Sequence, residues 1–288
     1  MPIDKRMRRM TKKLFSTKNG LPVTDEDFVS ALRSVDAEKA EILFIHFGMT
    51  FGVPNMDYKR DEILRTIYDA IREMNVKTVI FPTFTFSFPN GKDYDVRKSK
   101  SKMGALNEYV RRQPESIRSL DPLMSVTLVG DKKYLATGVG RESVGRDCTF
   151  DMLHREKGVK FLFLGTRPQD CFTYTHYIEW AVHVPYRYDR TFSGTIHADG
   201  GSYDATYKLF VRYKGVIPGG NDLADILLSR GDAKKSALGD SEVWAVDEAP
   251  AYALLCEKIK QYPEYMLSAT IPKALVDEFT LKGEMVAL

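Results

Sequence analysis

The sequence of 288 residues lacks a long apolar run, whereas a membrane-spanning helix needs roughly 18 apolar residues or more. Its basic start, MPIDKRMRRMTKK, is not followed by an apolar core either. We therefore expect neither a secretory signal nor a membrane anchor, and the protein is predicted to be cytoplasmic.

Cysteine is scarce as well: the chain has Cys148, Cys171 and Cys256, with no CxxC spacing. An odd number of cysteines without paired spacing argues against a disulfide framework and a structural zinc site. The formal net charge of +3 is too small to indicate a nucleic-acid surface. The sequence thus predicts no metal, no nucleic-acid partner and no membrane partner, although local basic patches would suit a phosphorylated ligand.

The composition and the predicted elements of the chain indicate an α/β protein. A length of 288 residues suits one large α/β domain or two unequal ones, and 43% hydrophobic and 28% charged residues are typical of an ordinary soluble globule. Buried strands are predicted at 42–46 and 76–81, with a helix at 59–74 between them, and such a unit favours a parallel sheet. Further β structure is predicted near the end of the chain, with stretches at 190–196, 203–213 and 242–246 and turns at 200–201 and 219–221.

One strand and the helix after it carry the residues with the clearest chemistry. An apolar strand is predicted at 159–164, followed by a polar loop and a helix that Thr173 caps. His176 and Glu179 lie one turn apart on this helix, which is one way in which an α/β fold presents a general base. The alternative is a partly exposed amphipathic helix with no catalytic role. His183 is not expected to complete a metal site, because roughly 10 Å of helix separates it from His176.

Six separated motifs follow one another in an order that one protein family shares. They are IH with Gly52 downstream (45–52), FPTFT (81–85), MGAL (103–106), RSLDPLMSV (118–126), FDML (150–153), and FLG leading to TYTHYIE (163–179). With these motifs the chain resembles the aminoglycoside 3-N-acetyltransferases, also called the antibiotic acetyltransferase-like family. The resemblance covers about residues 40–187.

The resemblance implies one three-layer α/β/α domain over residues 1–288, with a central mixed, mostly parallel sheet and additional β structure in the C-terminal third. It also implies transfer of an acetyl group from acetyl-coenzyme A to the amine of an amino sugar, without a metal. The expected partners are coenzyme A and a small amino-sugar acceptor, either an aminoglycoside or a nucleotide-linked amino sugar. A homodimer is left open.

In this reaction His176 is expected to take the amine's proton as general base. Glu179 is expected to hydrogen-bond the imidazole and to favour the imidazolium form. Asp170, just before the helix, is expected to bind other cationic groups of the acceptor.

For coenzyme A the resemblance points to three loops at one edge of the sheet. The expected contacts are Phe47, Gly48, Met49, Thr83, Ser119, Asp121 and Ser125. We also expect that enlarging Gly48 weakens coenzyme A binding more than it lowers stability, since close backbone approach suits glycine.

Several positions depart from the family pattern. Phe47 and Gly48 stand where small hydroxyl residues are usual, and Asp121 stands where a histidine is usual; a carboxylate there would repel phosphates and accept hydrogen bonds only. Cys148 is interpreted as a small residue standing for serine rather than as an acyl-carrying nucleophile, because no activating partner is visible. His46 is interpreted as a structural histidine rather than a second base.

The nature of the acceptor stays open at this point. A polycationic aminoglycoside would be attracted by an acidic excess, yet this chain is slightly basic and gathers positive charge at Arg97, Lys98, Lys100 and Lys102. An anionic acceptor such as a nucleotide-linked amino sugar would be at least as welcome there, so drug resistance is not assigned. A catalytically inactive binding protein of the same fold is the alternative function.

Overall fold

The structure is a computed structural model that describes residues 11–219 and 221–269. The basic residues 1–10 and Gly220, which belongs to the predicted turn at 219–221, lie outside the described residues. Among the residues that are described, no helix is long and apolar enough to cross a membrane.

A seven-stranded mixed sheet forms the centre of the fold, with the strand order β12-β13-β9-β3-β5-β8-β7. The strands are β3 (Ile42–Phe47), β5 (Thr78–Pro82), β7 (Ile117–Arg118), β8 (Val126–Gly130), β9 (Val159–Leu164), β12 (Ala233–Leu238) and β13 (Ser241–Asp247). The three central strands β9, β3 and β5 run parallel, and the flanking strands pair antiparallel. The prediction of a mixed α/β sheet is confirmed.

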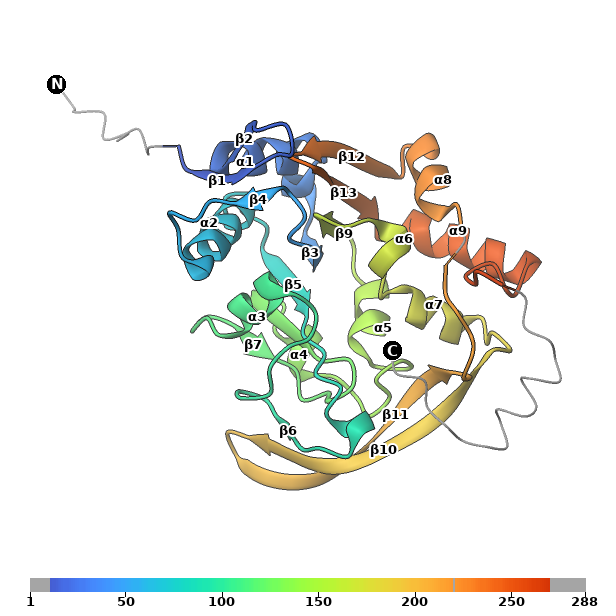
Figure 1. Cartoon of the computed structure of the whole chain (residues 1–288). Helices are drawn as coiled ribbons and strands as arrows, with labels where there is room; N and C mark the ends of the chain where they lie inside the picture. Colours follow the sequence, from blue (N-terminus) through green and yellow to red (C-terminus); the bar gives the residue numbers. More distant parts are fainter. Residues whose placement is uncertain (1–10, 220, 270–288) are drawn as a thin grey trace.

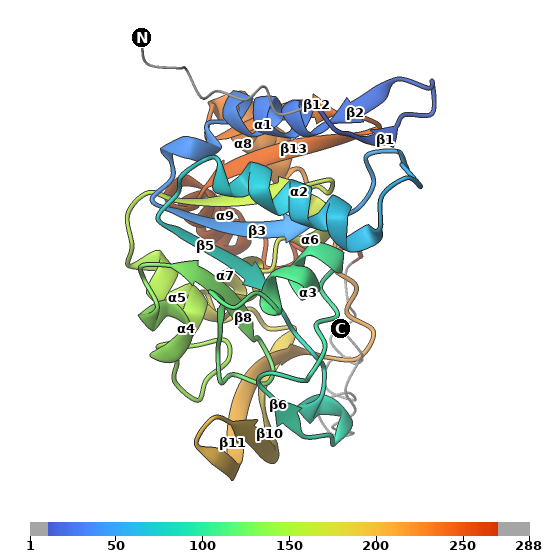
Figure 2. The same cartoon turned by 90° about the vertical axis from the view of Figure 1, so that its left-hand side faces the viewer.

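Helices cover both faces of this sheet (Figure 1). They are α1 (Asp25–Ser34), α2 (Arg60–Arg72), α3 (Ala105–Arg111), α4 (Tyr134–Thr137), α5 (Thr149–His154), α6 (Pro168–Cys171), α7 (Thr175–Ala181), α8 (Leu223–Arg230) and α9 (Glu248–Gln261), with 3-10 turns at Ala37–Lys39 and Phe88–Asn90. Figure 2 views the face that α1, α2 and α3 cover. On the other face α5, α7 and α9 pack, so the expected three layers are present.

The two cores follow from alternation along the buried strands, because successive side chains point to opposite faces. Leu43 and Ile45 of β3 belong to the core beneath α1, α2 and α3. Ile42 and Phe44 belong to the core that α5, α7 and α9 share. A strand buried on both faces reads as a continuous apolar run, and for that reason it could be recognised in the sequence.

A long hairpin adds the expected β structure in the C-terminal third. Strands β10 (Arg187–Ala198) and β11 (Gly201–Arg212) pair antiparallel, and β6 (Tyr94–Asp95) joins β10 in parallel. A further small sheet contains β1 (Lys13–Ser16), β2 (Pro22–Thr24) and β4 (Val53–Pro54). The hairpin lies along the lower edge of Figure 1, and its β10–β11 base is near α7.

Helix α7, which carries His176 and Glu179, differs from the predicted helix in its cap and its length. Thr173 does not cap it: the Thr173 hydroxyl hydrogen-bonds His46 Nε2 at 2.9 Å instead. The helix ends at Ala181, and His183 beyond it adopts a left-handed conformation with φ of 53°. This shorter helix is followed directly by the turn into β10.

The carboxyl ends of β3 and β9 approach each other at two glycines. The Gly48 amide donates to the Leu164 carbonyl at 2.9 Å, and a Cβ atom built on Gly48 would overlap the carbonyl oxygen of Gly165. The expectation that a larger residue at Gly48 would act mainly on coenzyme A binding is therefore corrected, because the obstacle is the protein's own backbone.

We predict that Gly48→Ala lowers the free energy of unfolding by ~1–3 kcal/mol, because β3 and β9 must separate to admit the methyl group. Urea unfolding followed by circular dichroism measures this change. Gly200→Ala is the matched control, since its Cβ meets nothing within 4 Å and should alter stability by less than about 0.5 kcal/mol. Equal stability of the two variants would contradict the prediction.

Candidate functional site

A cavity of about 510 Å³ brings together the three residues predicted for catalysis and acceptor binding. It opens at the carboxyl end of β9, between α6, α7 and the base of the β10–β11 hairpin. His176, Glu179 and Asp170 line it, together with Arg187 and Arg212. The remaining wall includes Phe172, Thr173, Pro218, Leu223 and Met266.

His176 is held as a neutral ring in this cavity. Its side chain is 17% exposed, and its Nδ1 atom accepts a hydrogen bond of 2.6 Å from Arg187 Nη2. Because a guanidinium only donates, Nδ1 carries no proton and the neutral ring is protonated on Nε2. Burial first, and then the positive charges of Arg187 and Arg212, lower the pKa of His176 well below its usual range.

Glu179 does not hydrogen-bond the imidazole, contrary to the expectation. Its Oε2 atom lies 3.9 Å from His176 Nδ1, because Arg187 Nη2 lies 2.6 Å from both atoms and bridges them. The other carboxylate oxygen accepts from the Tyr186 hydroxyl at 2.7 Å. Burial and the Glu179 charge raise the pKa of Tyr186, so this hydroxyl keeps its proton. Glu179 thus acts as the counter-ion of a buried arginine.

Arg187 and Arg212 were not expected at this site from the sequence. Register pairs them directly across the hairpin, at the first residue of β10 and the last residue of β11. The sequence signal that could have revealed this pair is the predicted turn at 200–201, because a hairpin folded at that turn places residues 187 and 212 approximately opposite each other. Like charges opposite each other are unfavourable in a sheet, so such a pair indicates a bound or built-in anion.

Asp170 and Cys171 lie at the rim, on the short helix α6. Asp170 is exposed, in a position from which it faces the cavity opening. Burial raises the pKa of the Cys171 thiol to about 11, so its thiolate is scarce at neutral pH.

His46 has a structural environment, as interpreted from the sequence. Its ring stacks on Phe163 with centroids 4.7 Å apart, and Nε2 accepts from the Thr173 amide at 3.3 Å in addition to contacting the hydroxyl. Burial lowers the pKa of His46 to about 3. The neutral ring ties the end of β3 to the segment that leads into α7.

The loops expected to bind coenzyme A meet at one edge of the sheet. Thr83 donates its amide to the Ser125 carbonyl at 2.7 Å, and the Ser125 hydroxyl donates to the Thr83 carbonyl at 2.7 Å. Ser119 accepts from the Val126 amide through its hydroxyl at 3.0 Å. These three hydroxyl side chains are buried, whereas Gly48 and Met49 are partly exposed beside Phe47.

Asp121 faces inward within this group of loops. Its Oδ1 atom accepts from the amides of Leu123 and Met124 at 2.8 and 3.1 Å, and from the Ser143 hydroxyl at 2.7 Å. Burial raises its pKa, while these donors oppose the rise. The visible role of Asp121 is to hold the turn, and its contact with coenzyme A stays a prediction.

Cys148 precedes α5 and acts as its N-cap, with the Asp151 amide donating to Sγ at 3.4 Å. Burial raises its pKa to about 11. A buried thiol of this kind is a poor nucleophile, which agrees with its interpretation as a structural residue.

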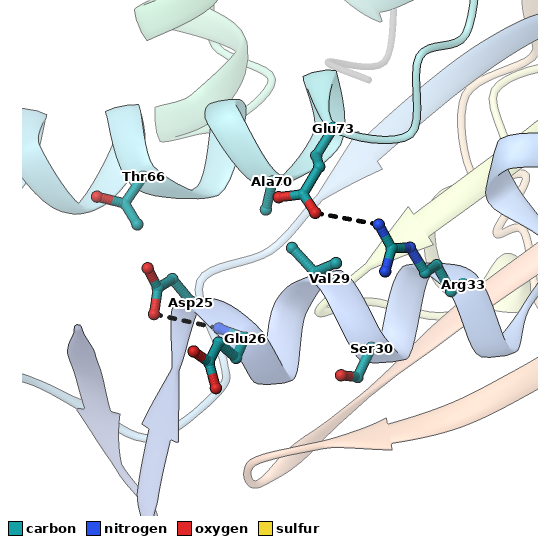
Figure 3. Close-up of a pocket in the computed structure, with 8 residues that line it drawn as sticks. All are labelled: Asp25, Glu26, Val29, Ser30, Arg33, Thr66, Ala70 and Glu73. Carbon is teal, nitrogen blue, oxygen red and sulfur yellow. Dashed lines mark hydrogen bonds and ion pairs between the residues drawn. The ribbon is translucent and has the colours of Figure 1, made fainter. Parts of the chain in front are cut away.

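A second pocket lies between α1 and α2, away from these loops (Figure 3). Arg33 and Glu73 face each other across it at 3.0 Å, and Asp25 Oδ1 accepts from the Lys12 and Glu26 amides at 2.8 and 3.2 Å. The charged side chains of this pocket therefore pair with groups on neighbouring segments of the chain. In residues 11–219 and 221–269, no group of three or more His, Cys, Asp or Glu side chains is placed to hold a metal ion.

Comparisons with known proteins give a family match. The sequence model of the family described as aminoglycoside 3-N-acetyltransferase matches residues 23–260. A sequence comparison with curated proteins gives no match.

Solved structures show the same fold. Aminoglycoside acetyltransferase AAC(3)-Xa is similar with a TM-score of 0.70 and 19% identity, over 85% of this chain and 94% of that one. AAC-IIIb in a binary complex with CoASH has a TM-score of 0.68 and 18% identity, over 86% and 98%. Sisomicin-bound AAC-VIa has a TM-score of 0.69 and 17% identity, over 82% and 97%.

We predict that Glu179→Gln lowers the free energy of unfolding by ~3–5 kcal/mol, because Arg187, only 2% exposed, then keeps a buried charge without its counter-ion. Chemical denaturation measures the change. Glu73→Gln is the matched control, since the Arg33–Glu73 pair is 57% and 49% exposed and should contribute less than about 1 kcal/mol. Similar losses in both variants would refute the buried-pair argument.

We also predict that stability falls as the pH is lowered from about 6.5 toward 3. The folded pKa of His46 is about 3, below the unfolded value of about 6.5, so the unfolded chain binds more protons between these values. His46→Gln, which keeps an acceptor for Thr173, should reduce this slope by up to ~1.4 kcal/mol per pH unit. Unfolding curves from pH 4.5 to 8 test it, and parallel pH profiles of variant and wild type would count against it.

Proposed function

Because the chain belongs to the aminoglycoside 3-N-acetyltransferase family of acetyl-coenzyme A-dependent enzymes, we propose that it acetylates the amine of an amino sugar bound in the His176 cavity. The observation that supports this most directly is the position of a neutral imidazole in a cavity at the carboxyl end of β9, one of the three parallel strands. That edge is where open α/β sheets bind ligands.

In the proposed reaction His176 takes a proton from the acceptor amine. The carbon–nitrogen bond forms as the carbon–sulfur bond of the thioester breaks, and the proton lost by nitrogen ends on the released thiol. Nδ1 is engaged by Arg187 in the free protein, so base action at this atom requires Arg187 Nη2 to move away. Glu179 Oε2, at 3.9 Å, would then favour the imidazolium.

Coenzyme A is proposed to bind over the three loops at the sheet edge. Gly48 and Met49 follow the end of β3, and their partial exposure suits contact with a ligand, whereas Phe47 is buried. Thr83, Ser119, Asp121 and Ser125 would shape the neighbouring surface through their backbone rather than through their buried side chains. The solved structure of AAC-IIIb, which shares the fold, is a binary complex with CoASH.

Thiol release from acetyl-coenzyme A tests the proposed activity. The purified protein is mixed with acetyl-coenzyme A and a panel of amines that includes neutral amino sugars, phosphorylated amino sugars and sisomicin. Thiol release that depends on an amine supports the proposal. Coenzyme A binding without thiol release for any amine would favour a catalytically inactive binding protein instead.

We predict that His176→Ala lowers turnover by about two to four orders of magnitude, because it removes the group that accepts the amine's proton. The dissociation constant of coenzyme A should stay nearly unchanged, since the ring acts on the acceptor. Steady-state kinetics and calorimetric titration measure the two quantities, with His183→Ala as a control at an exposed position beyond α7. Near-normal turnover of His176→Ala would place the base elsewhere.

A further inference from the structure

The cavity that contains His176 carries more positive than negative charge in its interior. Arg187 and Arg212 stand opposite each other in register, and both line the cavity. Glu179 lies against them as a single carboxylate, and it is already engaged by Arg187 and by the Tyr186 hydroxyl. Asp170 adds a second carboxylate only at the exposed rim.

Both guanidinium groups retain donors for a ligand. Arg187 uses Nη1 for the Phe210 carbonyl and Nη2 for His176 and Glu179, and its buried Nε has no hydrogen-bond partner among the residues that the structure describes. Arg212 is half-buried, and within the described part of the chain its guanidinium makes no hydrogen bond or ion pair. A planar guanidinium with free donors matches the oxygens of a phosphate or carboxylate.

We propose that Arg212 and Arg187 form an anion subsite, so that the preferred acceptor is an amino sugar that also carries a phosphate or a carboxylate. This inference rests on the proposed acetyl transfer in the same cavity and specifies its substrate class. A polycationic acceptor would have to bring further positive charge beside one buried and one half-buried arginine. An anionic acceptor would instead offset a like-charge pair that the hairpin register creates.

The subsite also connects acceptor binding to the base. An anion that hydrogen-bonds Arg187 draws its guanidinium away from His176 Nδ1 and offsets the positive charge that opposes imidazolium formation. The charged and titratable groups that face His176 are Glu179 on α7, Tyr186 and the two arginines of the hairpin, and Asp170 and Cys171 on α6.

The basic residues at positions 97–102, where an anionic acceptor was expected from the sequence, lie outside the His176 cavity. Arg97 contributes to a different cavity and pairs with Asp199 at 2.7 Å, and Lys98 pairs with Asp95 at 3.7 Å. His176 does not line that cavity. The interpretation of this loop as the acceptor's anion site is therefore replaced by the arginine pair.

Kinetics with four acceptors test the inference: glucosamine 6-phosphate, the 6-carboxylate analogue of glucosamine, glucosamine itself and sisomicin. We expect kcat/KM to be higher for the two anionic acceptors by about 10-fold or more. Arg212→Gln should lower the ratio of kcat/KM for each anionic acceptor to kcat/KM for glucosamine by ~10–100-fold. Arg212→Lys should retain part of the preference, and Arg230→Gln, an exposed arginine on α8, should retain all of it.

The phosphate and carboxylate arms show which anion the subsite prefers. Equal kcat/KM for anionic and neutral acceptors, or a preference that survives Arg212→Gln, would overturn the inference while leaving acetyl transfer intact. If no amine is acetylated, the proposed function itself fails, and a measurement without turnover decides the subsite.

That measurement uses inorganic sulfate, whose charge is constant near neutral pH, and the NMR signals of the His176 ring. Sulfate should shift these signals saturably in wild type and not in Arg212→Gln, because the anion rearranges the donors around Nδ1. The His176→Asn variant identifies the signals. No shift in wild type, or the same shift in Arg212→Gln, would show that the arginine pair is not an anion subsite.

Discussion

The buried ion pair between Arg187 and Glu179 is the interaction on which the candidate site depends. Arg187 extends from the first residue of β10 to α7, and it donates at the same time to the Phe210 carbonyl within the hairpin. The two side chains are 2% and 4% exposed, so neither charge is screened by water and each requires the other. The pair fixes the hairpin against α7, and thereby sets the hydrogen bonding of His176 and of Tyr186.

Much of the fold could be predicted because its central strands are apolar on both faces. The strands predicted at 42–46, 76–81 and 159–164 correspond to β3, β5 and β9. Strand β12 escaped prediction because it lies at the sheet edge, where its sequence AKKSAL exposes two lysines and shows little of the pattern of a buried strand. Strand β6 is two residues long and is defined by pairing with β10, which is distant in sequence.

The candidate site was predictable to the extent that it is local. His176 and Glu179 lie one helical turn apart, so their proximity followed from spacing alone. Their direct hydrogen bond was wrongly expected, because the intervening group is Arg187, and its position depends on how a whole hairpin packs on α7. In the same way, two amides of the turn and the Ser143 hydroxyl from a distant segment decide where the Asp121 carboxylate points.

His46 and His176 show how burial serves two different purposes in one site. At His46 the neutral ring has a structural role, because stacking on Phe163 and accepting a hydrogen bond from Thr173 require no proton exchange. At His176 the same burial, reinforced by two arginines, makes the ring a weak base in the free protein. Burial and two neighbouring arginines are unfavourable surroundings for a base, and natural folds retain such unfavourable surroundings mainly where function uses them. An acceptor that brings its own negative charge would offset the arginines when it binds, so His176 would become a stronger base only with the substrate in place.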